Sequence, residues 1–215
     1  MNVVFDNLDV FVAGMRTTVS LTLVSFAAAF VIGVVVAAFR VSPVPPLRAV
    51  GAFYVGTVRN TPLALLMVLF FFGFPDVGIQ FDSFWVSAVI VLSAYTGAFV
   101  GETVRAGINA VSRGQGEAAR ALGLTFPQTL RVVVLPQALR TVAAPLGSIF
   151  IALIKNSALA ALISVHELVG NTEDLITDFA QPIPIFLGAA VGYLILTLPS
   201  GLMVNVIERR VAIKR

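Results

Sequence analysis

The sequence predicts an all-α integral membrane protein with five transmembrane helices. Of the 215 residues 58% are hydrophobic and only 12% are charged, and the mean hydropathy is +0.97. Apolar runs of about 20 residues, enough to cross a ~30 Å hydrocarbon core, recur along the whole chain. The predicted spans are 11–39, 49–72, 84–107, 141–165 and 183–207.

The first three spans are bounded by clear signals. Residues Thr17–Phe39 are too long for the apolar core of a signal peptide and have no basic leader, so the first run is expected to stay as a span. Ser42–Pro46 breaks the helix that precedes it, and Gly73–Asp76 is expected to close the second span. The third span carries a charged residue, Glu102.

The last two spans have different characters. The fourth carries Lys155, whereas the fifth is uncharged over most of its length and starts after Gln181–Pro184. Gly188 and Gly192 form a small-x-x-x-small pair, which hints at close helix packing in the fifth span.

Charge asymmetry orients the predicted bundle. One set of connections carries the basic residues Arg40, Arg48, Arg105, Arg113, Arg120, Arg131, Arg140, Arg209, Arg210, Lys214 and Arg215. The other set carries the acidic residues Asp6, Asp9, Asp76, Asp82, Glu167, Glu173, Asp174 and Asp178. The positive-inside rule therefore places the amino terminus outside and the carboxyl terminus in the cytoplasm. Topology explains the pI near 9.8, so no nucleic-acid partner is expected, although the basic tail can contact anionic lipid.

A polar segment, 108–140, interrupts the apolar chain and is predicted to be cytoplasmic. Its signals indicate two short helices joined by a turn. A proline is also expected to end the second helix before the fourth span begins. In order, these signals are a capping box at Ser112 and Gln115, a helix stop at Gly123, a second box at Thr125 and Gln128, Pro127 in a first turn, and Pro136.

Residues 117–136 resemble the EAA loop of ATP-binding-cassette (ABC) importer permeases, E-A-A-x3-G-x9-I-x-L-P, and only Val133 departs from that pattern. The similarity extends from Ala94 to Ala119, which follows a longer pattern of the polar amino-acid branch. Short strings at 40–44 and at Leu196–Gly201 look most like actinobacterial glutamate-uptake permeases.

The resemblance implies a methionine-permease-like type I ABC importer core that occupies residues 1–215 as a single transmembrane domain. In such permeases the two loop helices dock on a separate ATPase. Glu117 would make a polar contact there, Gly123 would set the turn, and Leu135 and Pro136 would anchor the second helix. Small side chains, including Ala118 and Ala119, would permit close approach. The sequence contains no G-x-x-x-x-G-K-[ST] phosphate loop, so the chain is not expected to be an enzyme, and ATP and Mg would bind the partner.

The same resemblance implies the other partners. They are two ATPase subunits, a second permease chain that is more often different than identical, and an extracytoplasmic amino-acid-binding protein. The expected location is the bacterial cytoplasmic membrane. Glutamate is the expected cargo, with aspartate and glutamine left open.

Two cations lie within predicted spans, where charges are costly. At 1.5 Å rise per residue, Arg59 and Lys155 are about 15 and 21 Å from the cytoplasmic edge, near the midplane. They suit a cargo that carries carboxylates, and they also suit structural ion pairs or snorkelling. The predicted substrate-binding residues are Arg59, Asn60, Thr61, Lys155, Asn156 and Ser157. Glu102 is expected to pair with one of the two cations or with Arg105.

Two other classes of function remain open at this point. A secondary transporter or channel would also contain intramembrane charges and broken helices, but it leaves the EAA spacing unexplained. An intramembrane hydrolase would need a nucleophile beside a base near the midplane. The only histidine, His166, is predicted at the outer interface, and no metal site is expected there.

Overall fold

The computed structural model describes residues 2–76, 78, 81 and 83–211, all of which are helical or in short connections. Asp82, Lys214 and Arg215, which contributed to the predicted orientation, lie outside the described residues. Two short helices, α1 (Asn2–Asp6) and α5 (Phe74–Asp76), accompany longer ones. The remaining α-helices are α2 (Leu8–Val41), α3 (Pro45–Arg59), α4 (Leu63–Val68), α6 (Phe84–Ala110), α7 (Arg113–Ala121), α8 (Phe126–Gln128), α9 (Leu135–Asn156), α10 (Leu168–Phe179) and α11 (Pro182–Val211).

Among the described residues, four helical runs are long and apolar enough to cross a membrane. They are Leu8–Val41, Phe84–Ala110, Thr129–Ile163 and Pro182–Arg210. A fifth crossing exists only if the bent pair Pro45–Arg59 and Leu63–Gly73 counts as one span. The all-helical architecture is therefore as predicted, whereas the second predicted span, 49–72, is not a straight helix.

The second span bends by 103° between α3 and α4. Pro62 supplies the physical reason, because it has no N–H to donate and disfavours helical geometry at the residue before it. Beyond the bend the helix runs past the predicted edge at residue 72 into the stretch Gly73–Asp76 that was expected to close the span. It continues through the π-helical segment η1 (Leu69–Gly73) into α5.

The fourth span begins earlier than predicted. Pro136 was expected to interrupt the helix, but this expectation is wrong, because helical structure runs from Phe126 to Ile163. The π-helical segment η2 (Thr129–Val134) precedes α9, and Pro136 occupies the first turn of α9. In η2 the Leu135 N–H donates to the carbonyl of Leu130, five residues earlier instead of four. The hydrogen-bond register has therefore already shifted before Pro136, which has no N–H to donate. The 3₁₀-helical segment η3 (Ser157–Ile163) then ends the run.

Helices α2 and α6 form the centre of the bundle, and glycine lets their backbones approach. A Cβ atom on Gly101 would lie 2.9 Å from Cγ1 of Val36, and one on Gly97 would lie 2.8 Å from Cγ2 of Ile32. No larger residue fits at either position without moving a helix. Gly188 and Gly192 of α11 are packed as closely: added Cβ atoms would meet Phe11 at 2.9 Å and Leu168 at 2.8 Å. The close packing expected of this glycine pair is therefore confirmed.

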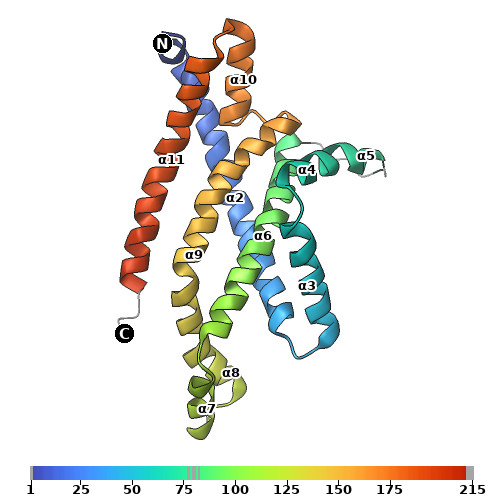
Figure 1. Cartoon of the computed structure of the whole chain (residues 1–215), viewed down its shortest axis with the longest axis vertical. Helices are drawn as coiled ribbons and strands as arrows, with labels where there is room; N and C mark the ends of the chain where they lie inside the picture. Colours follow the sequence, from blue (N-terminus) through green and yellow to red (C-terminus); the bar gives the residue numbers. More distant parts are fainter. Residues whose placement is uncertain (1, 77, 79–80, 82, 212–215) are drawn as a thin grey trace.

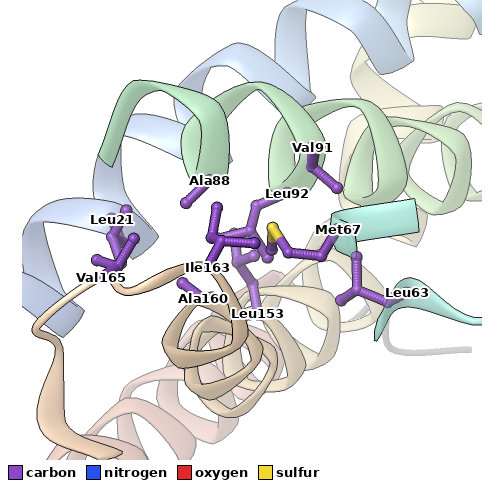
Figure 2. Close-up of a cluster of buried hydrophobic side chains, with 10 residues drawn as sticks. All are labelled: Leu21, Leu63, Met67, Ala88, Val91, Leu92, Leu153, Ala160, Ile163 and Val165. Carbon is purple, nitrogen blue, oxygen red and sulfur yellow. The ribbon is translucent and has the colours of Figure 1, made fainter. Parts of the chain in front are cut away.

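A buried apolar cluster joins the bent second span to the fourth. Figure 2 shows side chains of α4, α6, α9 and η3 meeting there, among them Leu63, Met67, Leu92, Leu153 and Ile163. Leu63 follows the bend directly, and Leu153 precedes the end of α9. The cluster therefore holds the break after α3 close to the junction of α9 and η3.

The two ends of the molecule differ. The α7–α8 segment lies at one end, and the turn between α2 and α3 and the end of α11 point toward that end (Figure 1). The amino terminus and α10 lie at the opposite end.

Candidate functional site

The turn after α7 has the geometry that its glycine permits. Gly123 has φ +80°, its N–H donates to Arg120 at 2.9 Å, and the N–H of Leu124 donates to Ala119 at 3.1 Å. These two bonds form a Schellman motif, which satisfies the last carbonyls of the helix. The turn predicted at this position is present, and it folds the following residues back toward α7.

The helix that follows carries only half of the second predicted box, because the Thr125 hydroxyl donates to Gln128 instead of accepting from the Gln128 N–H. The side-chain Oε1 of Gln128 accepts from the Thr125 N–H at 2.8 Å and from the Thr125 hydroxyl at 2.9 Å. The first box is wrong: Ser112 precedes α7 with no side-chain cap, and only the backbone bond from Gln115 N–H to Ser112 O, at 3.0 Å, is formed. The start of α7 thus depends on backbone geometry alone.

The α7–α8 segment exposes both apolar and acidic side chains. Leu122, at the end of α7, is 83% exposed. Glu117 and Ala118 are exposed as well, whereas Ala119 faces inward with only 3% exposure. The α7–α8 segment, which protrudes from the bundle (Figure 1), therefore presents both an apolar and an acidic side chain on its exposed surface.

Different residues from those predicted anchor the segment to the bundle. Leu135 and Pro136 are exposed, so the expected anchoring role is wrong within this chain. Ala138 and Val142, one and two turns further along α9, are buried against Gly107 of α6. Helical spacing explains the difference, because residues 138 and 142 share the face that α6 covers.

The break after α3 holds the first set of predicted substrate-binding residues. The guanidinium of Arg59 lies over the ring of Phe99, 4.9 Å from its centroid. Asn60 Nδ2 donates to Gly56 O at 2.7 Å, and the Thr61 hydroxyl donates to Thr57 O at 2.8 Å. Both side chains satisfy carbonyls that the bend leaves without helical partners, and all three residues remain accessible at its surface.

The second set lies where α9 passes into η3. Lys155 is exposed and Asn156 is partly exposed, but Ser157 is buried and its hydroxyl donates to Ile154 O at 2.7 Å. Within the described part of the chain, Lys155 has no carboxylate within 4.0 Å. The structure brings this junction and the break together through the cluster of Figure 2.

Glu102 pairs with two arginines. Arg105, one turn along α6, donates from Nε to both carboxylate oxygens at 3.1 Å and also from Nη2. Arg40, at the end of α2, donates to Oε2 at 3.4 Å. Of the partners considered for Glu102, Arg105 is the one observed, and Arg40 was not anticipated because the contact depends on how α2 and α6 cross.

His166 lies at the end of the molecule that carries α10. Its Nδ1 is 3.0 Å from Oδ2 of Asp174, and both side chains are largely exposed. No group of three or more potential metal-ligating side chains occurs among the described residues. Glu167, its neighbour in sequence, is fully buried, which sequence reasoning missed when it assigned this residue to an outer loop.

Similarity to known proteins assigns the chain to a protein family. Residues 29–213 match the family of the binding-protein-dependent transport system inner membrane component. The chain belongs to this family. It is accordingly an integral component of the inner, cytoplasmic membrane.

Relatives match over nearly the full length of the chain. It is 36% identical over 210 residues to the probable glutamine ABC transporter permease protein GlnM of Bacillus subtilis, covering 98% of this chain and 97% of GlnM. It is 39% identical over 210 residues to the glutamate transport system permease protein GluC of Corynebacterium glutamicum, covering 92% of each chain.

Solved structures share the fold. A chain from the crystal structure of an amino acid ABC transporter with histidines superposes with a TM-score of 0.91 at 29% identity, covering 96% of both chains. A chain of the MetNI methionine ABC transporter in an inward-facing conformation superposes with a TM-score of 0.79 at 24% identity, covering 95% of this chain and 97% of that one. The latter likeness establishes the type I importer fold, as the sequence predicted.

Proposed function

We propose that this chain is the permease subunit of an ATP-driven importer of polar amino acids, with glutamate or glutamine as the cargo. The family places it in a binding-protein-dependent transport system. Relatives named for glutamine and glutamate transport, which cover 92% or more of the chain, support the cargo class.

The observation that carries the proposal is the α7–α8 segment. It protrudes from one end of the bundle (Figure 1), its turn is fixed by Gly123, and it exposes Leu122 and Glu117. Such a tip can fit into a cleft of a separate ATPase, where apolar burial would supply affinity and the carboxylate would supply orientation. ATP and Mg would bind on that partner, and this chain would make and break no covalent bond.

Five spans and an outside amino terminus complete the proposed topology. The bent pair α3 and α4 would serve as the second span. The α2–α3 turn, with Arg48, and the last turn of α11, with Arg209 and Arg210, would then lie on the cytoplasmic side with the α7–α8 segment. Helix α10 would lie on the outside.

Arg59 and Lys155 are proposed to contact the cargo. Broken helices near the midplane leave backbone groups free to line a polar pathway. Arg59, Asn60 and Thr61 lie at one break, Lys155 and Asn156 lie at a neighbouring junction, and the buried Ser157 would shape that junction. Two accessible cations in this region would attract a substrate that carries carboxylates.

One five-helix chain would form half of a pathway, so a second permease chain is needed, and we propose a different chain over an identical one because the sequence resembles glutamate-uptake permeases. Each of two ATPase subunits would bind the α7–α8 segment of one permease chain. Their closure on ATP would draw the segments together and switch the pathway from inward-open to outward-open, where a binding protein would deliver the cargo.

Reconstitution tests this function. The chain is co-expressed with a candidate partner permease, ATPase and binding protein from the same organism, and the purified complex is placed in vesicles. Uptake of radiolabelled glutamate is measured in competition with unlabelled aspartate and glutamine. We expect uptake only when ATP is inside and the binding protein is outside. Uptake by this chain without an ATPase would instead identify a secondary transporter.

A further inference from the structure

A fully buried carboxylate lies at the end of the molecule opposite the α7–α8 segment, and the proposed transport mechanism does not use it. Glu167 is 0% exposed and precedes α10 as its N-cap. Its Oε1 accepts from the N–H groups of Val169 at 2.8 Å and Gly170 at 3.0 Å. Its Oε2 accepts from the hydroxyls of Tyr193 in α11 at 2.7 Å and Thr18 in α2 at 3.2 Å.

All four of these neighbours are donors. The Thr18 hydroxyl also accepts from the Leu168 N–H at 3.2 Å, so it links the carboxylate to the first turn of α10. Burial raises the pKa of the Glu167 carboxyl above its ordinary value, and the four hydrogen bonds act against that rise. A buried group that is satisfied at every lone pair, by three different helices, is strongly constrained in position.

The backbone around Glu167 is packed as tightly as its side chain. A Cβ atom on Gly14 of α2 would lie 2.8 Å from the Cα of Leu168, so α10 starts directly against the α2 backbone. Leu168 is itself 0% exposed and lies in a second apolar cluster with Phe11 and Ile185. Asn171 adds a hydrogen bond from Nδ2 to Val10 O at 2.9 Å. The start of α10 is therefore held against α2 and α11 by both packing and hydrogen bonds.

We propose that Glu167 is a positioning residue that joins α10 to α2 and α11 as one rigid unit, through which docking of the binding protein reaches the transmembrane helices. Helix α10 is an amphipathic segment of 12 residues whose outer residues, including Glu173 and Asp178, are exposed. Without the carboxylate, α10 would lose its hydrogen bonds to Thr18 of α2 and Tyr193 of α11, so a partner pressing on α10 could move it relative to these two spans. With it, the same contact moves two spans.

This inference rests on the proposed function, because it takes α10 as the outer side of an importer. It adds a residue whose role is neither to contact the cargo nor to contact the ATPase. It also gives a role to a carboxyl group at a site where burial is costly.

The test uses the complete importer in vesicles and compares ATPase rates with and without cargo-loaded binding protein. The variants are Glu167→Gln and Tyr193→Phe, which nearly keep side-chain size. Glu167→Gln replaces the carboxylate by an amide, and Tyr193→Phe removes the hydroxyl that donates to the carboxylate. Thr172→Val and Thr22→Val are matched controls, because each removes a buried hydroxyl that bonds only within its own helix, to Val169 O at 2.6 Å and to Thr18 O at 2.8 Å.

We expect each test variant to reduce the stimulation by binding protein about tenfold while leaving the unstimulated ATPase rate unchanged. The controls should keep full stimulation. A purely structural role would lower the basal and stimulated rates together, and full stimulation in Tyr193→Phe would also overturn the proposal. Failure of the proposed function is distinguishable, because then the unaltered complex would show no stimulation.

A distance measurement gives an independent readout. The chain has no cysteine, so spin labels can be placed on introduced cysteines at Thr177 of α10 and Leu187 of α11, both of which are exposed. We expect one narrow distance distribution that is the same with and without trapped ATP, and a broadened one in Glu167→Gln. A distribution that already shifts between states in the unaltered chain would mean that α10 is not rigidly joined to α11.

Discussion

Replacing Gly123 isolates the contribution of one backbone angle to coupling. Gly123 has φ +80°, and a Cβ atom built on it would meet no heavy atom within 4 Å. Steric collision therefore adds nothing, and the cost of a substitution comes from the left-handed conformation alone. That cost is about 1–2 kcal/mol for alanine, and more for a β-branched residue such as valine.

A penalty of this size lowers the equilibrium constant between the correctly turned segment and its alternatives by about 5- to 30-fold, which sets the upper limit of the loss. We therefore expect Gly123→Ala to reduce ATP-dependent uptake by up to this factor, and Gly123→Val to reduce it further. Gly123→Asn should lose least, because asparagine tolerates this conformation. The assay is uptake of labelled amino acid into vesicles, normalised to the amount of chain in the membrane, which should not change.

Gly116→Ala is the matched control. Gly116 lies inside α7, has no positive φ and also has open space around it. Alanine there should stabilise the helix by up to about 1 kcal/mol and leave uptake unchanged. Equal activity of Gly123→Val and the unaltered chain, or equal losses at positions 116 and 123, would refute the reasoning.

Three further substitutions probe other contacts. Glu117→Lys should lower the amount of ATPase that co-purifies with the chain, by reversing the charge at the exposed tip, and unchanged co-purification would place the contact elsewhere. Arg59→Gln should raise the KM for uptake in an assembled complex, since a cation facing the cargo is lost; a complex that fails to assemble would indicate a structural role. Gly107→Val should lower the Tm of the purified complex, because a Cβ at this position overlaps Val142 and overpacking costs about 1–3 kcal/mol. An unchanged Tm would mean that α6 and α9 separate freely at this contact.

Features that depend on local chemistry could be predicted from the sequence. Apolar runs gave the helices, and the glycine at 123 gave the turn, because a left-handed cap depends on one residue type. Half of the box at Thr125 and Gln128 formed because the two residues lie only three positions apart in the sequence. These signals act over a few residues and do not depend on how the helices pack.

Features that depend on packing could not be predicted. Pro136 is accommodated because a π-helical segment precedes it, a solution that residue preferences do not reveal. Arg40 reaches Glu102 only because α2 crosses α6. Glu167 was assigned to a loop by its sequence neighbours, although residues 149 and 26 positions away surround it. Contacts between residues so far apart in the chain produce no periodic pattern in the sequence.

Site-specific cross-linking at Leu122 tests the central claim most directly. Because the chain contains no cysteine, a single cysteine at this 83% exposed position would be its only reactive thiol. A cysteine at Phe179, exposed at the opposite end on α10, serves as the control. In the assembled complex we expect position 122, and not position 179, to form an adduct with the ATPase subunit. An ATPase adduct from position 179, or none from position 122, would contradict the account of the α7–α8 segment as the site where ATP hydrolysis is coupled to transport.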